Sequence, residues 1–142
     1  MLEFRSVQAS DRRLVQSYIL SMPYRNCDLS FANIFVWSFL YDTRIAEYGG
    51  SLFVKYKFHS KPFYMMPFGR CDLKTAIEKA IEDSTGDDLR FCMQGLSPKM
   101  KADIEEAMPE TFSFTSNRDY SDYIYLRDDL VGLSGKKYQP KR

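Results

Sequence analysis

The sequence predicts a single α+β domain with a mixed, mostly antiparallel sheet flanked by helices. Its 142 residues suit one domain with a sizeable core, and its 44% hydrophobic and 27% charged residues are ordinary for a globular protein. Segments with helical spacing and segments with alternating hydrophobicity follow each other in the order β-α-α-β-β-β-α-β-α-β-β. No internal repeat, low-complexity segment or linker interrupts this order.

Two helices are expected after a first strand at residues 2–7. In residues 11–22, apolar side chains recur at helical spacing until a proline ends the pattern. A second helix is expected at residues 31–41, with Asp28 or Ser30 as its N-cap. Its apolar side chains cover most of the circumference, which is typical of a buried helix.

Three strands are expected next, at the centre of the sheet. A Gly-Gly dipeptide at residues 49–50 predicts a hairpin turn between strands at residues 44–48 and 51–58. A third strand is expected at residues 63–68. It contains Pro67, which predicts a bulge, a sheet edge or the end of the strand.

The second half of the chain is expected to alternate helices with short strands. Asp72 starts a strongly amphipathic helix, and Ser97 with the proline after it starts another, as N-cap and first helical residue. The remaining strands are expected at residues 89–93, 111–115 and 120–126, and the last two as a hairpin.

Charge and cysteine content exclude several classes of protein. The net charge of +1 gives no overall attraction to nucleic acid or anionic lipid. Cys27, Cys71 and Cys92 form no CxxC pair, so we expect neither a disulfide framework nor a metal site. The N-terminus lacks the layout of a signal peptide, and no apolar run is long enough to cross a bilayer, so we expect a cytoplasmic protein without a transmembrane segment.

Candidate functional residues gather at the end of the sequence. Four cations follow a short apolar turn: Lys136, Lys137, Lys141 and Arg142. Such a cluster can bind the phosphates of RNA or of a lipid. A solvated basic tail, or the first turn of a helix between two domains, explains the same residues.

Other chemistry-bearing side chains favour structural roles. His59 is the only histidine, so no triad built on several histidines can form, and its place in a turn predicts an exposed loop residue. Tyr123 and Tyr125 lie two residues apart in a predicted strand and are expected to pack on one face. The sequence does not identify catalytic residues.

Two motifs and the element order point to known proteins. The segment DLSFANIFVW at residues 28–37 and the tail from Asp122 to Arg142, with Pro67-Phe68-Gly69 between them, resemble signatures of an uncharacterised bacterial family. That family is related to the C-terminal domain of phosphatidylglycerol lysyltransferase. The element order resembles the GNAT (acyl-CoA N-acyltransferase) fold over nearly the whole chain.

The resemblance implies a divided protein. Members of the family resemble two GNAT-like halves in tandem, so residues 1–133 are expected to be an N-terminal GNAT-like domain. Residues 134–142 are then a basic junction toward a second half that this chain lacks. The partners implied are that second half or another partner domain, and tRNA or lipid phosphate at the basic tail.

A GNAT-like site implies a phosphate cradle between the fourth strand and the helix after it. The corresponding residues are Gly69 and Arg70, which can bind an anion through backbone N–H groups. The match is incomplete, because only one glycine is present and Asp72 at the helix start repels a pyrophosphate. A plain turn capped by Asp72 explains the same residues.

The function implied is that of an acyltransferase-like half. We expect a supporting half of an aminoacyl- or acyltransferase that is inactive alone and holds no cofactor, with acyl-CoA or aminoacyl-tRNA as the donor of the longer protein. The alternatives are a stand-alone CoA-dependent N-acyltransferase and a non-enzymatic interaction module.

Overall fold

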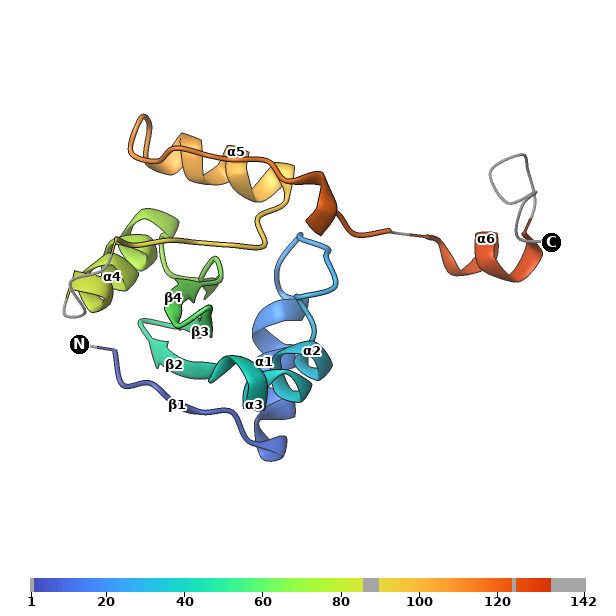
Figure 1. Cartoon of the computed structure of the whole chain (residues 1–142), viewed down its shortest axis with the longest axis horizontal. Coiled ribbons are helices and arrows are strands. Elements are labelled where there is room, and N and C mark those ends of the chain that lie inside the picture. The colour runs from blue at the N-terminus through green and yellow to red at the C-terminus, as the bar shows by residue number, and fades with distance from the viewer. Residues whose placement is uncertain (1, 86–89, 124, 134–142) are drawn as a thin grey trace.

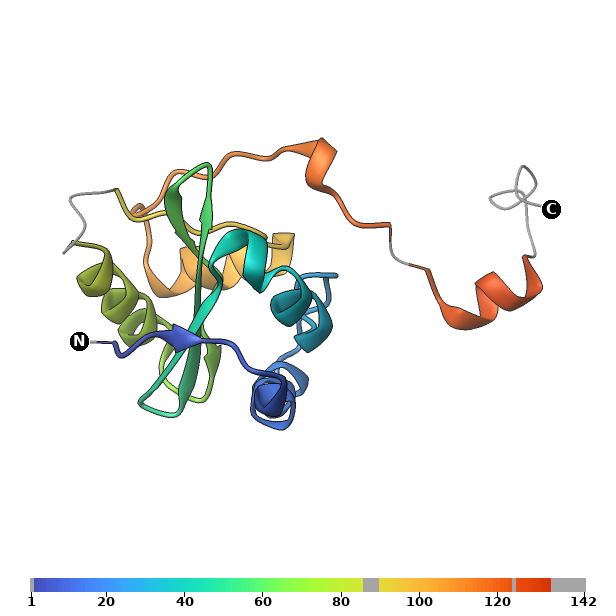
Figure 2. The ribbon, with the colours of Figure 1, turned by 60° about the horizontal axis from the view of Figure 1, so that its bottom comes forward.

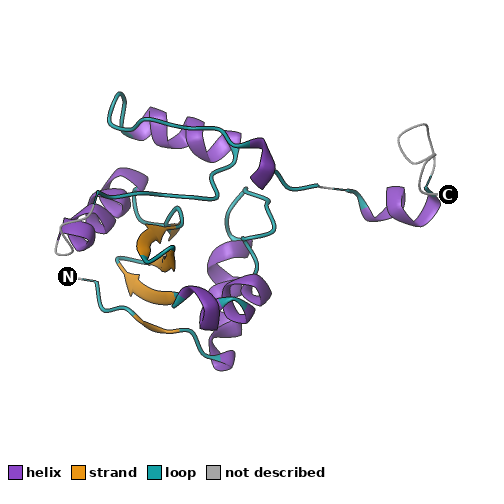
Figure 3. Cartoon of the chain, viewed as in Figure 1, coloured by secondary structure: helices purple, strands orange, loops and turns teal. Residues whose placement is uncertain are grey.

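The architecture is α+β, with helices on both faces of an antiparallel sheet (Figure 3). A computed structural model of the chain describes residues 2–85, 90–123 and 125–133. The strands of the sheet are β1 (Arg5–Ser6), β2 (Arg44–Tyr48), β3 (Ser51–Phe58), β4 (Lys61–Tyr64) and β5 (Phe68–Gly69). The helices are α1 (Arg12–Leu20), α2 (Phe31–Val36), α3 (Ser38–Tyr41), α4 (Leu73–Thr85), α5 (Pro98–Ala107) and α6 (Arg127–Gly132).

Strand β3 organises the sheet. It pairs with β2 along one edge and with β4 and then β5 along the other, all antiparallel. The predicted Gly-Gly turn joins β2 to β3, with positive φ angles of 58° at Gly49 and 77° at Gly50. Pro67 ends the predicted third strand early, so that β4 and β5 are separate short strands, as its sequence position indicates.

The two faces of β3 belong to different cores, because successive side chains point to opposite sides. Leu52 and Val54 pack against Val15 of α1 and Ile34 of α2. Phe53, on the other face, packs against small residues of α4, Ala76 and Ala80. The sheet is therefore covered by α1 and α2 on one side and by α4 on the other (Figure 1).

Helix α5 completes the second core. Met100 and Ile104 of α5 are buried against Ile77 of α4 and Met66, which follows β4. Ser97 accepts a hydrogen bond from the Met100 N–H at 3.3 Å, and Pro98 occupies the first helical position, as the sequence predicts. Asp72 likewise accepts the Thr75 N–H at 3.0 Å and starts α4.

The predicted order of the later strands is wrong. Residues 111–115 form no strand, although Phe112 and Phe114 both pack toward α5. A strand is expected at residues 89–93. The described part of this segment, residues 90–93, has one isolated parallel bridge, between Met93 and Tyr64. The described part of 120–126 contains the end of a 3-10 turn, Arg118–Tyr120, and extended chain without a strand.

The apolar helix expected at residues 31–41 is neither continuous nor buried. It divides at Trp37 into α2 and α3, and only its inner side packs on the core, through Ile34. Asn33 and Ser38 bond to nearby backbone, donating to Cys27 O at 2.7 Å and Phe35 O at 2.7 Å. The outer side of the two helices is exposed to solvent.

The chain leaves the body after the second 3-10 turn. Residues 121–123 and 125–133, here called the arm, run outward and carry α6 away from the other helices and the sheet in two views (Figures 1 and 2). Among the described residues, no helix has the length and apolar character needed to cross a membrane.

Candidate functional site

The two signature segments meet where the arm leaves the body. The Cys27 backbone N–H donates to Asp122 Oδ2 at 2.7 Å, and the Cys27 thiol donates to Asp122 Oδ1 at 2.9 Å. Cys27 directly precedes the first signature segment, and Asp122 opens the second. We call this contact, with the loop that holds Cys27, the signature junction.

Side-chain amides hold the loop of the signature junction in place. Asn26 accepts the Leu29 N–H at 2.9 Å and donates to Gly95 O at 3.0 Å. Ser30 caps α2 by accepting the Asn33 N–H at 3.2 Å. Cys27 is thus fixed between the start of α2 and the segment around Gly95, ready to receive Asp122.

The acids of the junction suppress the reactivity of the thiol. The hydrogen bond to Asp122, followed by burial and the charge of Asp28, raises the pKa of Cys27 to about 12. Burial and the nearby Asp122 carboxylate raise the pKa of Asp28 above its usual value. A thiol that stays protonated at neutral pH is a poor nucleophile, so the junction is suited to holding the arm rather than to covalent catalysis.

The Gly69-Arg70 segment lies against the hairpin turn of β2 and β3. A Cβ atom at Gly69, where φ is +146°, would lie 2.4 Å from Gly50 O and 2.7 Å from Ser51 Cα. The Arg70 N–H donates to Gly50 O at 3.2 Å, and the Cys71 N–H donates to Ser51 Oγ at 3.3 Å. These contacts explain why glycine stands here, and anion binding by Gly69 and Arg70 stays a prediction.

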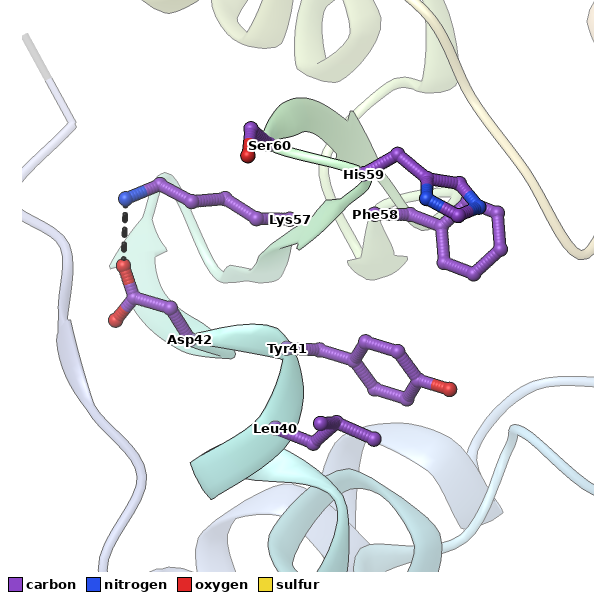
Figure 4. Close-up of a pocket in the computed structure, with 7 residues that line it drawn as sticks. All are labelled: Leu40, Tyr41, Asp42, Lys57, Phe58, His59 and Ser60. Carbon is purple, nitrogen blue, oxygen red and sulfur yellow. Dashed lines mark ion pairs between the residues drawn. The ribbon is translucent and has the colours of Figure 1, made fainter.

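His59 lies at an open hollow of about 480 Å³ between α3 and the β3–β4 turn (Figure 4). The hollow is lined by Leu40, Tyr41, Asp42, Lys57, Phe58, His59 and Ser60. His59 is exposed in the turn, as predicted, and its ring centroid lies 4.3 Å from that of Phe58. Lys57 Nζ forms an ion pair with Asp42 Oδ2 at 2.8 Å across the rim. The ion pair of Asp42 and Lys57 thus places one negative and one positive charge at the rim of the hollow.

A second charged cluster lies under α4 and was not anticipated from the sequence. Asp83 Oδ2 accepts from Lys55 Nζ at 3.0 Å and from the Tyr64 hydroxyl at 2.7 Å. Burial lowers the pKa of Lys55, but its bonds to Asp83 and Tyr64 outweigh this effect and raise the pKa overall. Tyr64 is only 1% exposed, and its bond to Asp83 links the sheet to α4. Distant charges on a strand and a helix give no sequence signal of such a contact.

The remaining candidates lie on or beyond the arm. Tyr123 is 86% exposed, so its predicted packing is wrong. The cations at positions 136, 137, 141 and 142 lie outside the described residues, and their role stays a prediction. Within the ranges that the structure describes, no three His, Cys, Asp or Glu side chains gather in a way that could hold a metal ion.

Comparison with known proteins identifies the family. The family model described as phosphatidylglycerol lysyltransferase, C-terminal, matches residues 21–142. The chain belongs to this family. The matched range includes both Cys27 and Asp122, the two residues that meet at the signature junction.

A solved protein of similar structure is about twice as long. The crystal structure of a conserved protein of unknown function from Bacteroides thetaiotaomicron VPI-5482 superimposes with a TM-score of 0.92 and 44% sequence identity. The alignment covers 99% of this chain and 48% of that chain. This chain therefore spans about half the length of that protein. A search of curated proteins gave no match.

Proposed function

We propose that this chain is the N-terminal GNAT-like half of an aminoacyl- or acyltransferase, and that it supports a second half instead of catalysing a reaction alone. The observation that carries the proposal is the family match over residues 21–142, to a domain named for a lysyltransferase. The 48% coverage of the solved relative fits a protein made of two parts.

The order of the early elements supports a GNAT-like fold. A strand, helices and the four antiparallel strands β2 to β5 precede α4, and the segment after α4 bridges β4 in parallel through Met93. The predicted order has three strands at this place, because it joins the segments of β4 and β5 into one strand. Fold alone does not decide an activity, so the family match carries the functional part.

The hydrogen bonds of the candidate residues favour a non-catalytic, supporting role for this chain. The Cys27 thiol is held protonated by Asp122, and the Arg70 and Cys71 N–H groups donate to the neighbouring hairpin turn. A pyrophosphate at this position would have to displace those bonds and approach Asp72, which carries a negative charge. Donor binding is therefore assigned to the second half, with acyl-CoA or aminoacyl-tRNA as the donor.

The basic tail belongs to the same proposal. Lys136, Lys137, Lys141 and Arg142 are proposed to contact phosphates of tRNA or of a lipid headgroup, because clustered cations attract such anions. A cytoplasmic location is part of this proposal, since it gives access to aminoacyl-tRNA.

Calorimetric titration of two polypeptides tests the proposal. One is the 142-residue chain and the other continues through the second half, and each is titrated with acetyl-CoA and with a non-hydrolysable aminoacyl-tRNA analogue. We expect heat of binding from the longer polypeptide only. Equal binding of acetyl-CoA by the 142-residue chain would favour a stand-alone N-acyltransferase. No binding of either donor by the longer polypeptide would favour an interaction module.

A further inference from the structure

Exposed apolar side chains are concentrated on two segments of this chain. Among the described residues, nine of eleven exposed large hydrophobic residues lie either on α2–α3 or near and on the arm. They are Val36, Trp37, Phe39 and Leu40 on the helices, and Tyr120, Tyr123, Leu126, Leu130 and Val131 beside and along the arm. Large apolar patches of this kind mark sites of interaction more often than single exposed residues do.

The four exposed side chains on α2–α3, here called the apolar face, lie within five consecutive positions, 36–40. Phe39 is 82% exposed, Leu40 and Val36 are 56% exposed, and Trp37 is 47% exposed. The pattern of this segment predicts burial on nearly all sides, yet the body covers only its inner side. The discrepancy is resolved if another body covers the outer side.

Charged groups border the apolar face. Asp42, the residue that ends α3, forms ion pairs with Arg44 at 3.1 Å and with Lys57 at 2.8 Å. An aromatic and aliphatic centre with charges at its edge matches the composition of protein interfaces, whose core is apolar and whose rim is polar. The centre is rich in aromatic side chains, which supply much of the binding energy at interfaces.

The arm starts beside the loop that leads into α2, the first of the two helices that carry the apolar face. Asp122 is fixed to Cys27, and α2 begins at Phe31, four residues after Cys27. Whatever follows the arm is therefore tethered on the side of the body where α2 begins. A short tether raises the effective concentration of a following unit to the order of millimolar, which favours docking within one polypeptide.

We infer that the apolar face docks a second globular unit that follows the arm in the same polypeptide. This inference rests on the proposed function, and the doubled length of the solved relative supplies a unit of suitable size. A second copy of this chain is the competing occupant. A symmetric pair joined through the apolar face leaves the apolar residues of the arm uncovered, whereas a unit that follows the arm covers both segments.

Trp37 provides a direct probe, because it is the only tryptophan among the 142 residues. The test compares this chain with the longer polypeptide in which any other tryptophan is replaced by phenylalanine. We expect Trp37 emission to shift to shorter wavelength in the longer polypeptide, and acrylamide quenching to fall about threefold or more, because interface cores exclude water.

Two matched substitutions locate the contact. Phe39→Asp changes a side chain on the apolar face that is 82% exposed, and Leu20→Asp changes one at the end of α1 that is 81% exposed. In the longer polypeptide, Phe39→Asp is expected to restore the quenching of Trp37, and Leu20→Asp to leave it low. In the 142-residue chain both variants are expected to keep the parent stability, because neither side chain is buried.

Three outcomes would overturn the inference. The first is a reading frame that stops at Arg142, and the second is equal quenching of Trp37 in both polypeptides. The third is a concentration-dependent blue shift of the 142-residue chain that accompanies dimer formation in sedimentation velocity, which would identify a second copy as the occupant.

Donor titration of the same longer polypeptide separates this inference from the proposed function. Donor binding with an exposed Trp37 contradicts the docking surface alone. A protected Trp37 without donor binding supports the docking surface and contradicts the transferase assignment.

Discussion

Cys27 and Asp122 are 95 residues apart in the sequence and are joined by two hydrogen bonds of 2.7 and 2.9 Å. Both acceptor oxygens of one carboxylate are used, one by a backbone N–H and one by a thiol. The contact fixes the point at which the arm leaves the body. It also ties the loop that precedes residues 28–37 to the start of the tail at Asp122.

Asp122→Asn is expected to increase the reactivity of Cys27. The hydrogen bond to Asp122, together with burial and the charge of Asp28, raises the pKa of this thiol to about 12, so little thiolate is present at pH 8. Loss of the negative charge lowers the pKa toward its usual value, and alkylation of Cys27 at pH 8 should accelerate by about tenfold or more. Peptide mass spectrometry after timed iodoacetamide treatment measures this, with Cys92 as internal reference. Asp119→Asn, three residues away, serves as control, and an equal effect of both variants would contradict the assignment.

Gly69→Ala is expected to be more destabilising than Gly50→Ala. Both glycines have positive φ angles, which cost another residue about 1–2 kcal/mol. At Gly50 the added Cβ meets nothing within 4 Å, whereas at Gly69 it would meet Gly50 O at 2.4 Å. Relief of that overlap adds roughly 1–3 kcal/mol at Gly69. Urea unfolding of the two variants measures the difference, and equal losses of unfolding free energy would show that the close approach is not rigid.

Asp83→Ala is expected to lower the free energy of unfolding by roughly 1–3 kcal/mol, because Lys55 and Tyr64 lose a shared acceptor in a mostly buried place. Glu82→Ala, at the neighbouring position on α4, removes the ion pair between Glu82 and Lys79. The Glu82 side chain is 66% exposed. That control is expected to leave the stability close to that of the parent, because a solvated ion pair contributes little. Chemical denaturation at pH 7 compares the two, and similar effects would argue against the cluster as a tie between α4 and the sheet.

Asp11→Asn is expected to remove an acid-sensitive part of the stability. Asp11 accepts two bonds of 2.7 Å from Arg5 and one of 2.7 Å from the Gln8 N–H. The bond from Arg5, with the Gln8 N–H and the Arg5 charge, outweighs burial and lowers the pKa of Asp11. A lowered carboxyl pKa stabilises the fold above the unfolded pKa of about 4, and this contribution is lost as pH falls through the folded value.

The difference between parent and Asp11→Asn should therefore be about 1 kcal/mol at pH 7, because Arg5 is half exposed, and should shrink below pH 4. Thermal unfolding between pH 3 and pH 7 measures this. Glu3→Gln, a nearby exposed carboxylate, is expected to give a curve parallel to the parent. A difference for Asp11→Asn that does not change with pH would contradict the assigned role.

Local patterns predicted the elements whose partners are near in sequence. The β2–β3 hairpin, the start of α4 at Asp72 and the Ser97 cap of α5 all depend on residues within a few positions of each other. The strand expected at residues 111–115 shows where such patterns fail. Phe112 and Phe114 are apolar residues separated by a polar one because one side of that segment packs on α5. An alternating pattern shows that one side of a segment is covered, but it does not show that the backbone pairs with another strand.

The functional contacts required information that a single sequence lacks. Nothing in the residues around Cys27 indicates that Asp122 will reach it, and the charge of Lys55 gives no sign of Asp83 on a later helix. The helix expected at residues 31–41 failed differently. Its apolar pattern predicts cover on all sides, and the described body supplies cover on one side only, through Ile34 and its neighbours.

The pairing pattern of β3 also implies an order of assembly. Its turns to β2 and β4 join neighbouring residues, Tyr48 with Ser51 and Phe58 with Lys61. Hairpins of this kind form in about 1–10 μs, whereas a ribosome adds about 5–20 residues per second. The three-stranded meander thus has time to form long before Asp122 is synthesised. The contact of Asp122 with Cys27, which spans 95 residues, can form only after that local pairing has had time to form.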